Sequence, residues 1–353
     1  MANKINYDLI QREIDDNNII YDNFSIKHKK QEKWLGDQLH EEGLQASNLA
    51  TVMERRPRTI GAIFELKEVL QDIRLHSLGR MTSGLLIWKL AVIPMLLSNA
   101  STWTELTTAT LQELDKLEAL FLSVLLAVPL SSPRPSLLWD TGTLSMENKI
   151  IKKKLNLIFH IKSLDDKTLA KQVYMEQIKN NWPGLTKEVE DICECLVIVN
   201  ITKTDARNIH PWTDDEITKY SWKKIVSKAV EKKNTKELKM KMEKYAKLDE
   251  LKEETECEIK PYLKNLTMKD ARMQYRLRVN MFDCKMNYSS DIKNSATLWK
   301  CDSCMTNIDT QSHVLRCPAY AKLREGLSLD NDQDILKYYH EVMKIRDKLK
   351  LRK

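Results

Sequence analysis

The stretch that decides the fold of the C-terminal part reads Cys301-Asp-Ser-Cys304-Met-Thr-Asn-Ile-Asp-Thr-Gln-Ser-His313-Val-Leu-Arg-Cys317. Its C-x2-C-x8-H-x3-C spacing offers three thiolates and one imidazole, a donor set that suits tetrahedral Zn²⁺. Cys301 and Cys304 can share one tight turn, and one helical turn puts His313 and Cys317 on the same face. We therefore predict a structural zinc site with these four residues as its ligands.

The residues around this quartet suit a small metal-centred core. Leu298 and Trp299 precede the first pair, and Val314 and Leu315 lie inside the second, so apolar side chains can pack around the ion. Met305 stands where many such turns carry glycine or another small residue. The alternative is a set of ordinary buried cysteines beside a surface histidine. A zinc hydrolase is disfavoured, because four protein ligands leave no position for an activated water.

The composition favours a helical intracellular protein. With 353 residues the chain has room for two or three modules of about 100–150 residues each. Only 8 Gly and 9 Pro favour long helices over many-turned β structure. The first twelve residues lack the apolar run of a signal peptide, and the apolar stretches 84–100 and 117–130 suit buried helices rather than membrane spans. Seven cysteines without a disulfide pattern indicate a reducing compartment, the nucleus or the cytoplasm.

Hydrophobic periodicity predicts three helices in the first half of the chain, after two short N-terminal strands at 19–26 and 34–36. The first helix covers 61–75 and stops near Gly79. The second starts at Thr110, which we expect to form a capping box with Glu113, and ends before Pro129. The third covers 144–162. We expect its apolar face to consist of Ile151, Leu155, Ile158 and Ile161. We expect its solvent side to carry Lys152, Lys153 and Lys154.

Positive charge is concentrated between Lys219 and Lys300. This stretch holds 18 Lys and 3 Arg against 12 acidic residues, a net charge of +9, which leaves the remainder of the chain at −2. Such a segment can bind phosphates. For the Lys/Glu-rich part from Glu231 to Glu258 the sequence favours an ordinary solvated helix surface. Cys193 and Cys195, in an apolar patch without a second pair nearby, are interpreted as core residues.

The most specific basic element lies just before the cysteine quartet. Thr267 is expected to cap a helix with Asp270 at its third position. Lys269, Arg272 and Arg276 share one face of that helix, because spacings of three and four residues return to the same side. We take these three, together with Lys152 and Lys153, as candidate nucleic-acid-binding residues, with helix solubility as the alternative role.

Several segments together resemble the C-terminal part of a non-LTR retrotransposon reverse transcriptase, over most of residues 30–345 and weakly from 166 to 260. The segments are Lys33-Trp-Leu-Gly-Asp-Gln-Leu-His40, Leu90-Ala-Val-Ile-Pro94, Leu125-Leu-Ala-Val-Pro129, Ile150-Ile-Lys-Lys-Lys-Leu155, Asp270-Ala-Arg272 through Met281, Lys285-Met-Asn287, and the quartet region with Gln311-Ser-His313 and Cys317-Pro-Ala-Tyr-Ala-Lys-Leu-Arg-Glu-Gly326. The quartet and Trp34-Leu-Gly36 are the more specific of these.

The resemblance implies a mainly α protein: a helical thumb-like region, a few short N-terminal strands and a small C-terminal zinc knuckle. Residues 1–45 would be the end of a polymerase palm and 46–165 a helical thumb-like domain. Residues 166–260 would be a helical, Lys/Glu-rich linker, and 261–353 a basic helix with a CCHC zinc-binding module.

The catalytic carboxylates of that family are not recognisable near the expected palm. Polymerisation needs an aromatic-x-Asp-Asp box and a third aspartate to hold two Mg²⁺ ions. Before Trp34 the only paired acids are Asp15 and Asp16, without an aromatic residue in the box position, and we interpret them as surface residues. The 36 residues after Cys317 contain no convincing nuclease cluster either.

We therefore expect a catalytically inactive fragment of a reverse transcriptase, as a 5′-truncated copy or a gene-model fragment. It would bind RNA or DNA but no membrane and no small-molecule substrate. The alternative, from a different class, is a helical protein-interaction module whose zinc is purely structural. Nucleic-acid binding itself discriminates between the two.

Overall fold

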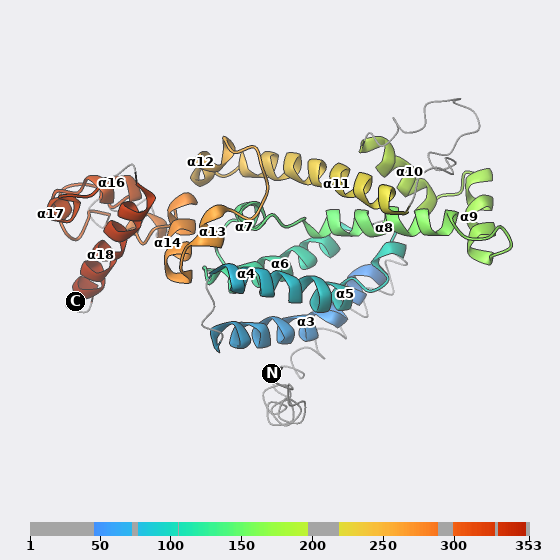
Figure 1. The fold of residues 1–353 in the computed structure, drawn as a ribbon, viewed down its shortest axis with the longest axis horizontal. Coiled ribbons are helices and arrows are strands. Elements are labelled where there is room, and N and C mark those ends of the chain that lie inside the picture. Colours follow the sequence, from blue (N-terminus) through green and yellow to red (C-terminus); the bar gives the residue numbers. More distant parts are fainter. Residues whose placement is uncertain are drawn as a thin grey trace, which may run out of the picture.

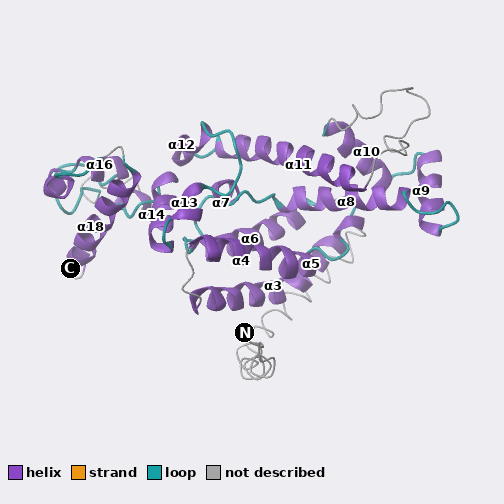
Figure 2. Ribbon diagram, in the orientation of Figure 1, coloured by secondary structure: helices purple, strands orange, loops and turns teal. Residues whose placement is uncertain are grey.

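The computed structural model describes residues 46–72, 77–104, 106–196, 219–288, 299–328 and 331–350. Throughout these ranges the chain is mainly helical and contains no β-strand (Figure 2). The expected strands at 19–26 and 34–36, and Asp15 and Asp16, lie outside the described residues. No helix within the described ranges combines the length and apolarity that crossing a bilayer requires.

The longer helices form an elongated stack with a smaller module at one end (Figure 1). In chain order the main helices are α3 (Ala46–Asp72), α4 (Ser77–Ile87), α5 (Ile93–Leu96), α6 (Thr108–Leu126), α7 (Arg134–Asp140), α8 (Met146–Lys162), α9 (Leu169–Lys179), α10 (Leu185–Cys195), α11 (Lys219–Met242), α12 (Asp249–Lys252), α13 (Pro261–Asn265), α14 (Met268–Arg278), α15 (Lys285–Tyr288), α16 (Gln311–Arg316), α17 (Ala321–Arg324) and α18 (Asp332–Lys350). A π-helical turn, Trp88–Val92, joins α4 to α5, and its Trp88 ring stacks on Phe121 of α6 at 4.0 Å.

The first expected helix is longer than its sequence signals indicate. α3 begins at Ala46, runs through Pro57 and packs along α6, while Gly79 lies inside α4 instead of ending a helix. Proline removes one backbone hydrogen bond and strains the preceding turn. Nearby contacts hold this part of the helix in place: Thr59 Oγ1 donates to the Arg55 carbonyl, and the Arg55 guanidinium donates to the carbonyls of Leu96 and Ser98.

The second helix starts three residues earlier in the chain than expected, with its N-cap at Thr107. Thr107, not Thr110, caps α6, and its hydroxyl accepts from the Thr110 amide at 3.2 Å. Thr110 is fully buried and hydrogen-bonds to the Thr107 hydroxyl. The end is as predicted: α6 stops at Leu126, and Ala127 takes a left-handed conformation before Pro129.

The third helix, α8, buries Ile151, Leu155 and Ile158 as predicted, but the placement of Lys154 on its solvent side was wrong. Lys154 is fully buried and pairs with Glu188 of α10 at 2.5 Å. Its position three residues after Ile151 and four before Ile158 puts it on the apolar face of the helix. Lys152 and Lys153 are half-buried.

Among the residues that the structure describes, three hydrophobic clusters hold the helices together, and long helices run from one cluster to the next. The largest lies between α3, α4, α6, α7 and α13. A second joins α8, α9, α10 and the first half of α11. It buries Cys193 as predicted, whereas the placement of Cys195 in the core was wrong, because Cys195 is exposed two residues further along the same helix. Residues of the expected linker segment thus pack on α8. The third cluster surrounds the cysteine quartet and α18.

Helix α14 belongs to two of these clusters at once. Ala271, Tyr275 and Val279 pack into the largest cluster, whereas Met273 and Leu277 pack into the C-terminal one. Every second residue is therefore buried, a pattern more typical of a strand, because positions two apart on a helix face nearly opposite directions. Thr267 caps the helix as predicted and accepts from the Asp270 amide at 3.3 Å. Figure 1 shows α14 between the helical stack and the C-terminal module.

Candidate metal centre

The first two cysteines lie on a short hairpin. An antiparallel bridge pairs Lys300 with Ile308, and the Cys301 amide donates to the Asn307 carbonyl at 2.8 Å. The turn between them folds back through a hydrogen bond from the Met305 amide to the Cys301 carbonyl at 2.8 Å. Met305 has a φ of 57°, the left-handed conformation that glycine adopts without cost. The hairpin therefore brings the side chains of Cys301 and Cys304 together, as the spacing predicts.

The other two candidate ligands come from α16 and the residue after it. Thr310 caps this helix, and its hydroxyl accepts from the His313 amide at 3.0 Å. The helix ends at Arg316, and Cys317 follows in an extended conformation that still directs its thiol back to the hairpin. The cap at Thr310 and the short helix that follows it thus determine the positions of His313 and Cys317.

All four donor atoms lie within 4.8 Å of one another. The Sγ atoms of Cys301 and Cys317 are 3.9 Å apart, and Cys304 Sγ is 3.4 Å from His313 Nε2. A tetrahedral Zn²⁺ with bonds of about 2.3 Å to sulfur requires donor separations of about 3.8 Å. The cluster could therefore hold a metal ion with little rearrangement.

The electrostatics of the thiols also suit a cation. Although burial opposes ionisation of Cys304, hydrogen bonds from the Asn307 backbone and from Thr306 lower its pKa to about 6. Burial, and further the charge of neighbouring Cys301, raise the pKa of Cys317 to about 12. Three adjacent thiolates repel one another, so a divalent cation between them removes the obstacle to ionising the third.

The site is half in and half out of the C-terminal core. Cys301 and Cys317 are fully buried, whereas Cys304 and His313 are partly exposed. Val314 and Trp299 are buried as predicted, and Leu315 packs against the cluster. Leu298 lies outside the described residues.

A second ring of polar contacts, which the sequence analysis missed, holds the two halves of the site in place. Arg346 of α18 pairs with Asp309 at the end of the hairpin, Arg324 donates to the Cys317 carbonyl at 2.9 Å, and Tyr338 donates to the Val314 carbonyl. Ser303 and Tyr320 share a hydrogen bond of 2.5 Å across the turn. These pairs cannot be predicted from a local sequence motif, because each joins residues at least seven positions apart.

The candidate nucleic-acid-binding residues fall into two separate places. Lys269 and Arg272 are exposed and Arg276 is half-buried, and their spacing of three and four residues puts them on one side of α14. Lys153 instead donates to the Leu97 carbonyl at 3.1 Å, just after α5. Burial lowers the pKa of both Lys152 and Lys153. The structure therefore does not bring Lys152 and Lys153 together with the basic side of α14.

Comparison with known proteins adds no relative: no protein-family model, no curated protein and no solved structure matches this chain.

Proposed function

We propose that Cys301, Cys304, His313 and Cys317 bind a structural Zn²⁺, and that the module built around it binds single-stranded RNA or DNA. Three sulfurs and one imidazole nitrogen at tetrahedral separations favour zinc among the common divalent metals. Four protein donors fill its coordination, so the proposed role of the metal is folding and not turnover. The proposal agrees with the resemblance to the C-terminal part of a non-LTR reverse transcriptase, and we propose no catalytic activity.

The observation that carries the proposal is an uncompensated arginine pair. We call Lys269, Arg272 and Arg276 the basic face of α14. Within the described part of the chain, no carboxylate pairs with the guanidinium of Arg272 or of Arg276. Partial desolvation, and next the charge of Arg276, lower the pKa of Arg272.

The acids nearest in sequence serve other partners. Asp270 accepts a hydrogen bond from Thr267 and pairs with His340 Nε2 at 2.8 Å. Arg278, on another side of the helix, binds Asp140 and Glu254 at 3.1 Å and 2.7 Å. The remaining arginines thus form a cationic strip along the seam between two cores. Its Arg276 Nε is buried without a hydrogen-bond partner in the described structure. A phosphate group at the exposed Arg272 would supply the missing negative charge.

The test is binding of labelled 20-nucleotide RNA and DNA to the whole zinc-loaded chain, measured by fluorescence anisotropy at several salt concentrations. The whole chain is needed because Ala271, Tyr275 and Val279 belong to the larger core, which a C-terminal fragment would leave incomplete. Replacing both arginines (Arg272→Gln, Arg276→Gln) should weaken binding about tenfold and reduce the salt slope by about 1.5, from ~0.7 per lost phosphate contact on a single strand.

The matched control is Arg56→Gln with Arg58→Gln on α3, which removes the same charge from another helix. An unchanged affinity in the α14 variant, or an equal loss in the control, would contradict the proposal. Binding that does not respond to salt would contradict it as well, since phosphate neutralisation releases counterions.

A second candidate, a protein-interaction module, is favoured by one observation. Helix α9, at the end of the stack opposite the candidate metal centre, exposes Leu169 and Val173, which lie four residues apart on one side of the helix, and Leu169 is 75% exposed. Neighbouring exposed apolar side chains are typical of protein-binding surfaces. A chain that binds no nucleic acid at any salt concentration, yet retains its zinc, would favour this second function.

A further inference from the structure

Outside the candidate metal module, helix α11 carries a row of four exposed lysines. The buried side of this helix repeats every four residues, through Trp222, Val226, Val230, Asn234, Leu238 and Met242. The opposite side follows the same four-residue step and consists of Lys224, Lys228, Lys232 and Lys236, all exposed. We call these four the lysine row. Successive members lie about 6 Å apart along the helix axis, so the row is about 18 Å long.

Only one lysine of the row, Lys228, has an acid at a helical contact spacing, Glu231 three residues on. Lys224, Lys232 and Lys236 have no Asp or Glu three or four residues away in either direction. Among the described residues no carboxylate forms an ion pair with any of the four. Lysines elsewhere behave differently: Lys116, Lys179, Lys187 and Lys344 each pair with an acid on their own helix.

Of the two acids of α11, Glu237 is turned toward the helical stack and Glu231 is exposed. Glu237 pairs with Lys233 at 2.5 Å and accepts from Asn148 of α8 at 2.9 Å. Glu231 acts on Lys152 of α8, where its charge opposes the effect of burial on the lysine pKa. The four-residue step of the row therefore contains no carboxylate, although Glu231 lies exposed between Lys228 and Lys232 in the chain. A solvated Lys/Glu surface, which the sequence favours here, would place acids within the row itself.

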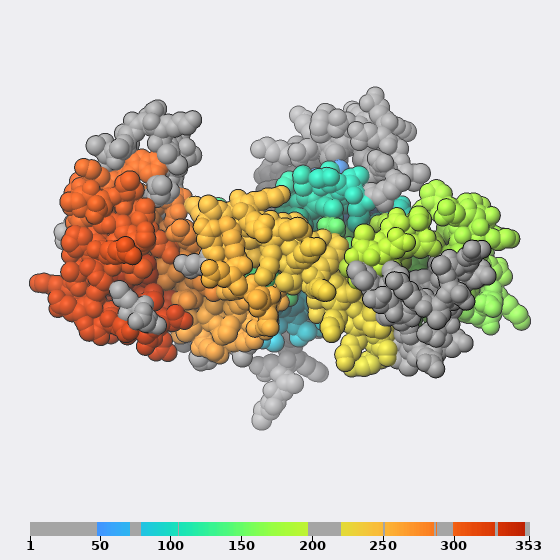
Figure 3. All heavy atoms as spheres, turned by 90° about the horizontal axis from the view of Figure 1, so that it is seen from above, coloured from blue at the N-terminus to red at the C-terminus, as the bar shows by residue number. Residues whose placement is uncertain are grey.

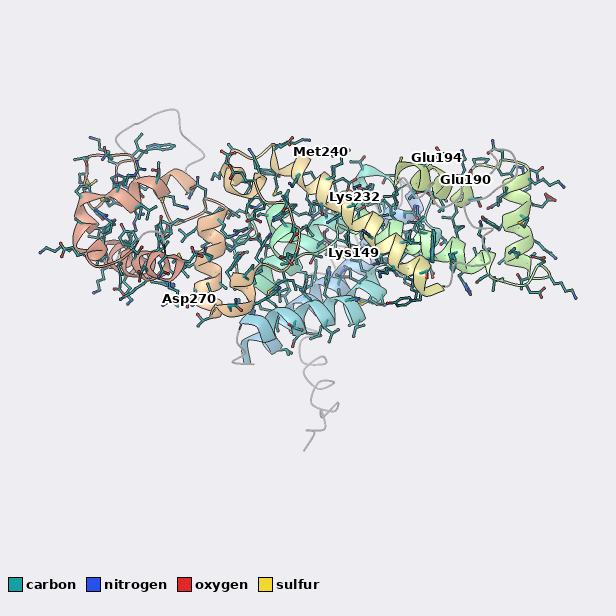
Figure 4. The ribbon with its side chains drawn as sticks, turned by 45° about the horizontal axis from the view of Figure 1, so that its top comes forward. Lys149, Glu190, Glu194, Lys232, Met240 and Asp270 are labelled. Atoms are coloured by element: carbon teal, nitrogen blue, oxygen red, sulfur yellow. The ribbon has the colours of Figure 1, made fainter. Side chains whose placement is uncertain are left out.

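The row lies on the exposed side of α11, with one large exposed apolar or aromatic side chain at each end, Tyr220 and Met240. In the space-filling view α11, in yellow, forms part of the outer surface of the molecule (Figure 3). Figure 4 labels Lys232 and Met240 on this helix. Met240, 47% exposed, continues the four-residue step after Lys236, and Tyr220, 78% exposed, precedes it before Lys224. A helix that lies on a membrane needs an apolar face free to enter the lipid. Here that face is buried in the protein, so a lipid surface fits poorly.

We propose that the lysine row is a second contact surface for the sugar–phosphate backbone of a nucleic acid, independent of the metal module; this inference rests on the function proposed above. Lysines at a helical spacing of four repel one another, and a polyanion laid along the row removes that repulsion. A straight line of ammonium groups neutralises successive phosphates without reading bases. The row therefore adds affinity and salt dependence but no sequence preference.

The experiment compares two full-length, zinc-loaded variants that lose the same charge. In the first, the lysine row is replaced (Lys224→Gln, Lys228→Gln, Lys232→Gln, Lys236→Gln). In the second, the four paired lysines are replaced (Lys116→Gln, Lys179→Gln, Lys187→Gln, Lys344→Gln). Both keep good helix formers at every position, and circular dichroism and metal content verify the fold. The probes are a 30-nucleotide RNA, a 30-nucleotide DNA and vesicles of phosphatidylserine with phosphatidylcholine.

The row variant should bind both nucleic acids at least tenfold more weakly, with a salt slope lower by about 3, from ~0.7 per phosphate contact. The control variant should change little. Equal losses in the two variants would show a general charge effect and overturn the proposal. Vesicle binding that depends on the row, with nucleic-acid binding that does not, would overturn it in favour of a lipid partner.

Comparison with the Arg272 and Arg276 variant separates this inference from the proposed function. If the arginine variant loses affinity and the row variant does not, the metal module binds alone and the row inference fails. If only the row variant loses affinity, the inference stands and the role of the basic face of α14 fails. A wild-type chain that binds neither nucleic acid overturns both.

Discussion

The Arg346 guanidinium forms a two-nitrogen ion pair with the Asp309 carboxylate, with Nη2 2.5 Å from Oδ1 and Nη1 3.1 Å from Oδ2. Asp309 directly follows the hairpin that carries Cys301 and Cys304, and it also accepts from the Lys285 amide at 2.9 Å. Arg346 in turn donates to the Asp283 carbonyl. One arginine near the end of α18 thus fixes the hairpin to the segment that follows α14.

Replacing Arg346 by Ala should loosen the metal hairpin. The Asp309 side chain is 4% exposed, so the substitution leaves a buried carboxylate without its counter-charge, at a cost of about 3 kcal/mol. That cost corresponds to about 100-fold weaker metal binding in competition with a chelator. Lys344→Ala is the control, because its pair with Glu341 is exposed and contributes at most about 0.5 kcal/mol. Equal metal affinities in the two variants would refute this role of Arg346.

Metal removal should unfold the C-terminal module and leave the helical stack. We expect one zinc per chain by elemental analysis, and Cys301→Ser or His313→Ala should abolish stoichiometric binding. After chelation, amide exchange should accelerate across 299–317 and α18, while α6 stays protected by its own cluster. Cys195→Ser, on an exposed cysteine of α10, should leave the metal content unchanged. A fully loaded His313→Ala protein would contradict the ligand set.

Asp115 should make stability fall as the pH rises through mildly acidic values. Burial, and the nearby charge of Glu118, raise its pKa to about 6 despite the opposing effect of Arg134. The folded state then binds a proton that the unfolded state releases near pH 4, so this contribution is largest at low pH and is lost above about pH 6. Asp115→Asn should therefore raise the free energy of unfolding at pH 7.5 by about 1–2 kcal/mol, with no gain at pH 4. Urea unfolding at both pH values gives the difference, and a gain independent of pH would argue against this titration.

Met305→Gly should strengthen the metal site. Met305 holds a φ of 57° in the turn after Cys304, and its side chain is 63% exposed, so little packing is lost on its removal. Relief of the left-handed backbone strain should exceed the entropy that glycine adds to the unfolded chain, with a net gain of about 0.5 kcal/mol. Met305→Ala, which removes the same side chain but retains the strain, should show no gain in thermal unfolding. A gain with alanine as large as with glycine would mean that the side chain, and not the backbone, is unfavourable.

Features that depend on neighbouring residues in the chain could be predicted from the sequence, whereas pairs between distant segments could not. The metal quartet follows from spacing, and the cap at Thr267 follows from residue type, because both depend on neighbours in the chain. The burial of Lys154 could have been seen from its position on the apolar face of its helix. Its partner Glu188 could not, since the pair joins residues 34 positions apart.

Buried charges in the helical stack show the same limit. The carboxylate of Glu118 is fully buried and forms ion pairs with Arg134, at 2.7 Å, and with Lys149. Arg80 is 8% exposed and donates to three backbone carbonyls, of Leu70, Val124 and Leu125 near the ends of α3 and α6. Periodicity assigns such residues to the surface, because it cannot reveal the carbonyls and counter-charges that satisfy them.

The side chains of α14 are buried in two different hydrophobic clusters, and this limits which amino-acid substitutions the helix can accept. Positions 271, 273, 275, 277 and 279 must each fit a packed interior, in two different neighbourhoods, so a saturation scan of the helix should show intolerance at alternate codons. Packing does not constrain exposed Arg272 between them, so the nucleic-acid contact proposed above would be what retains its charge. The pattern of accepted replacements would then resemble that of a sheet, although the backbone is helical throughout.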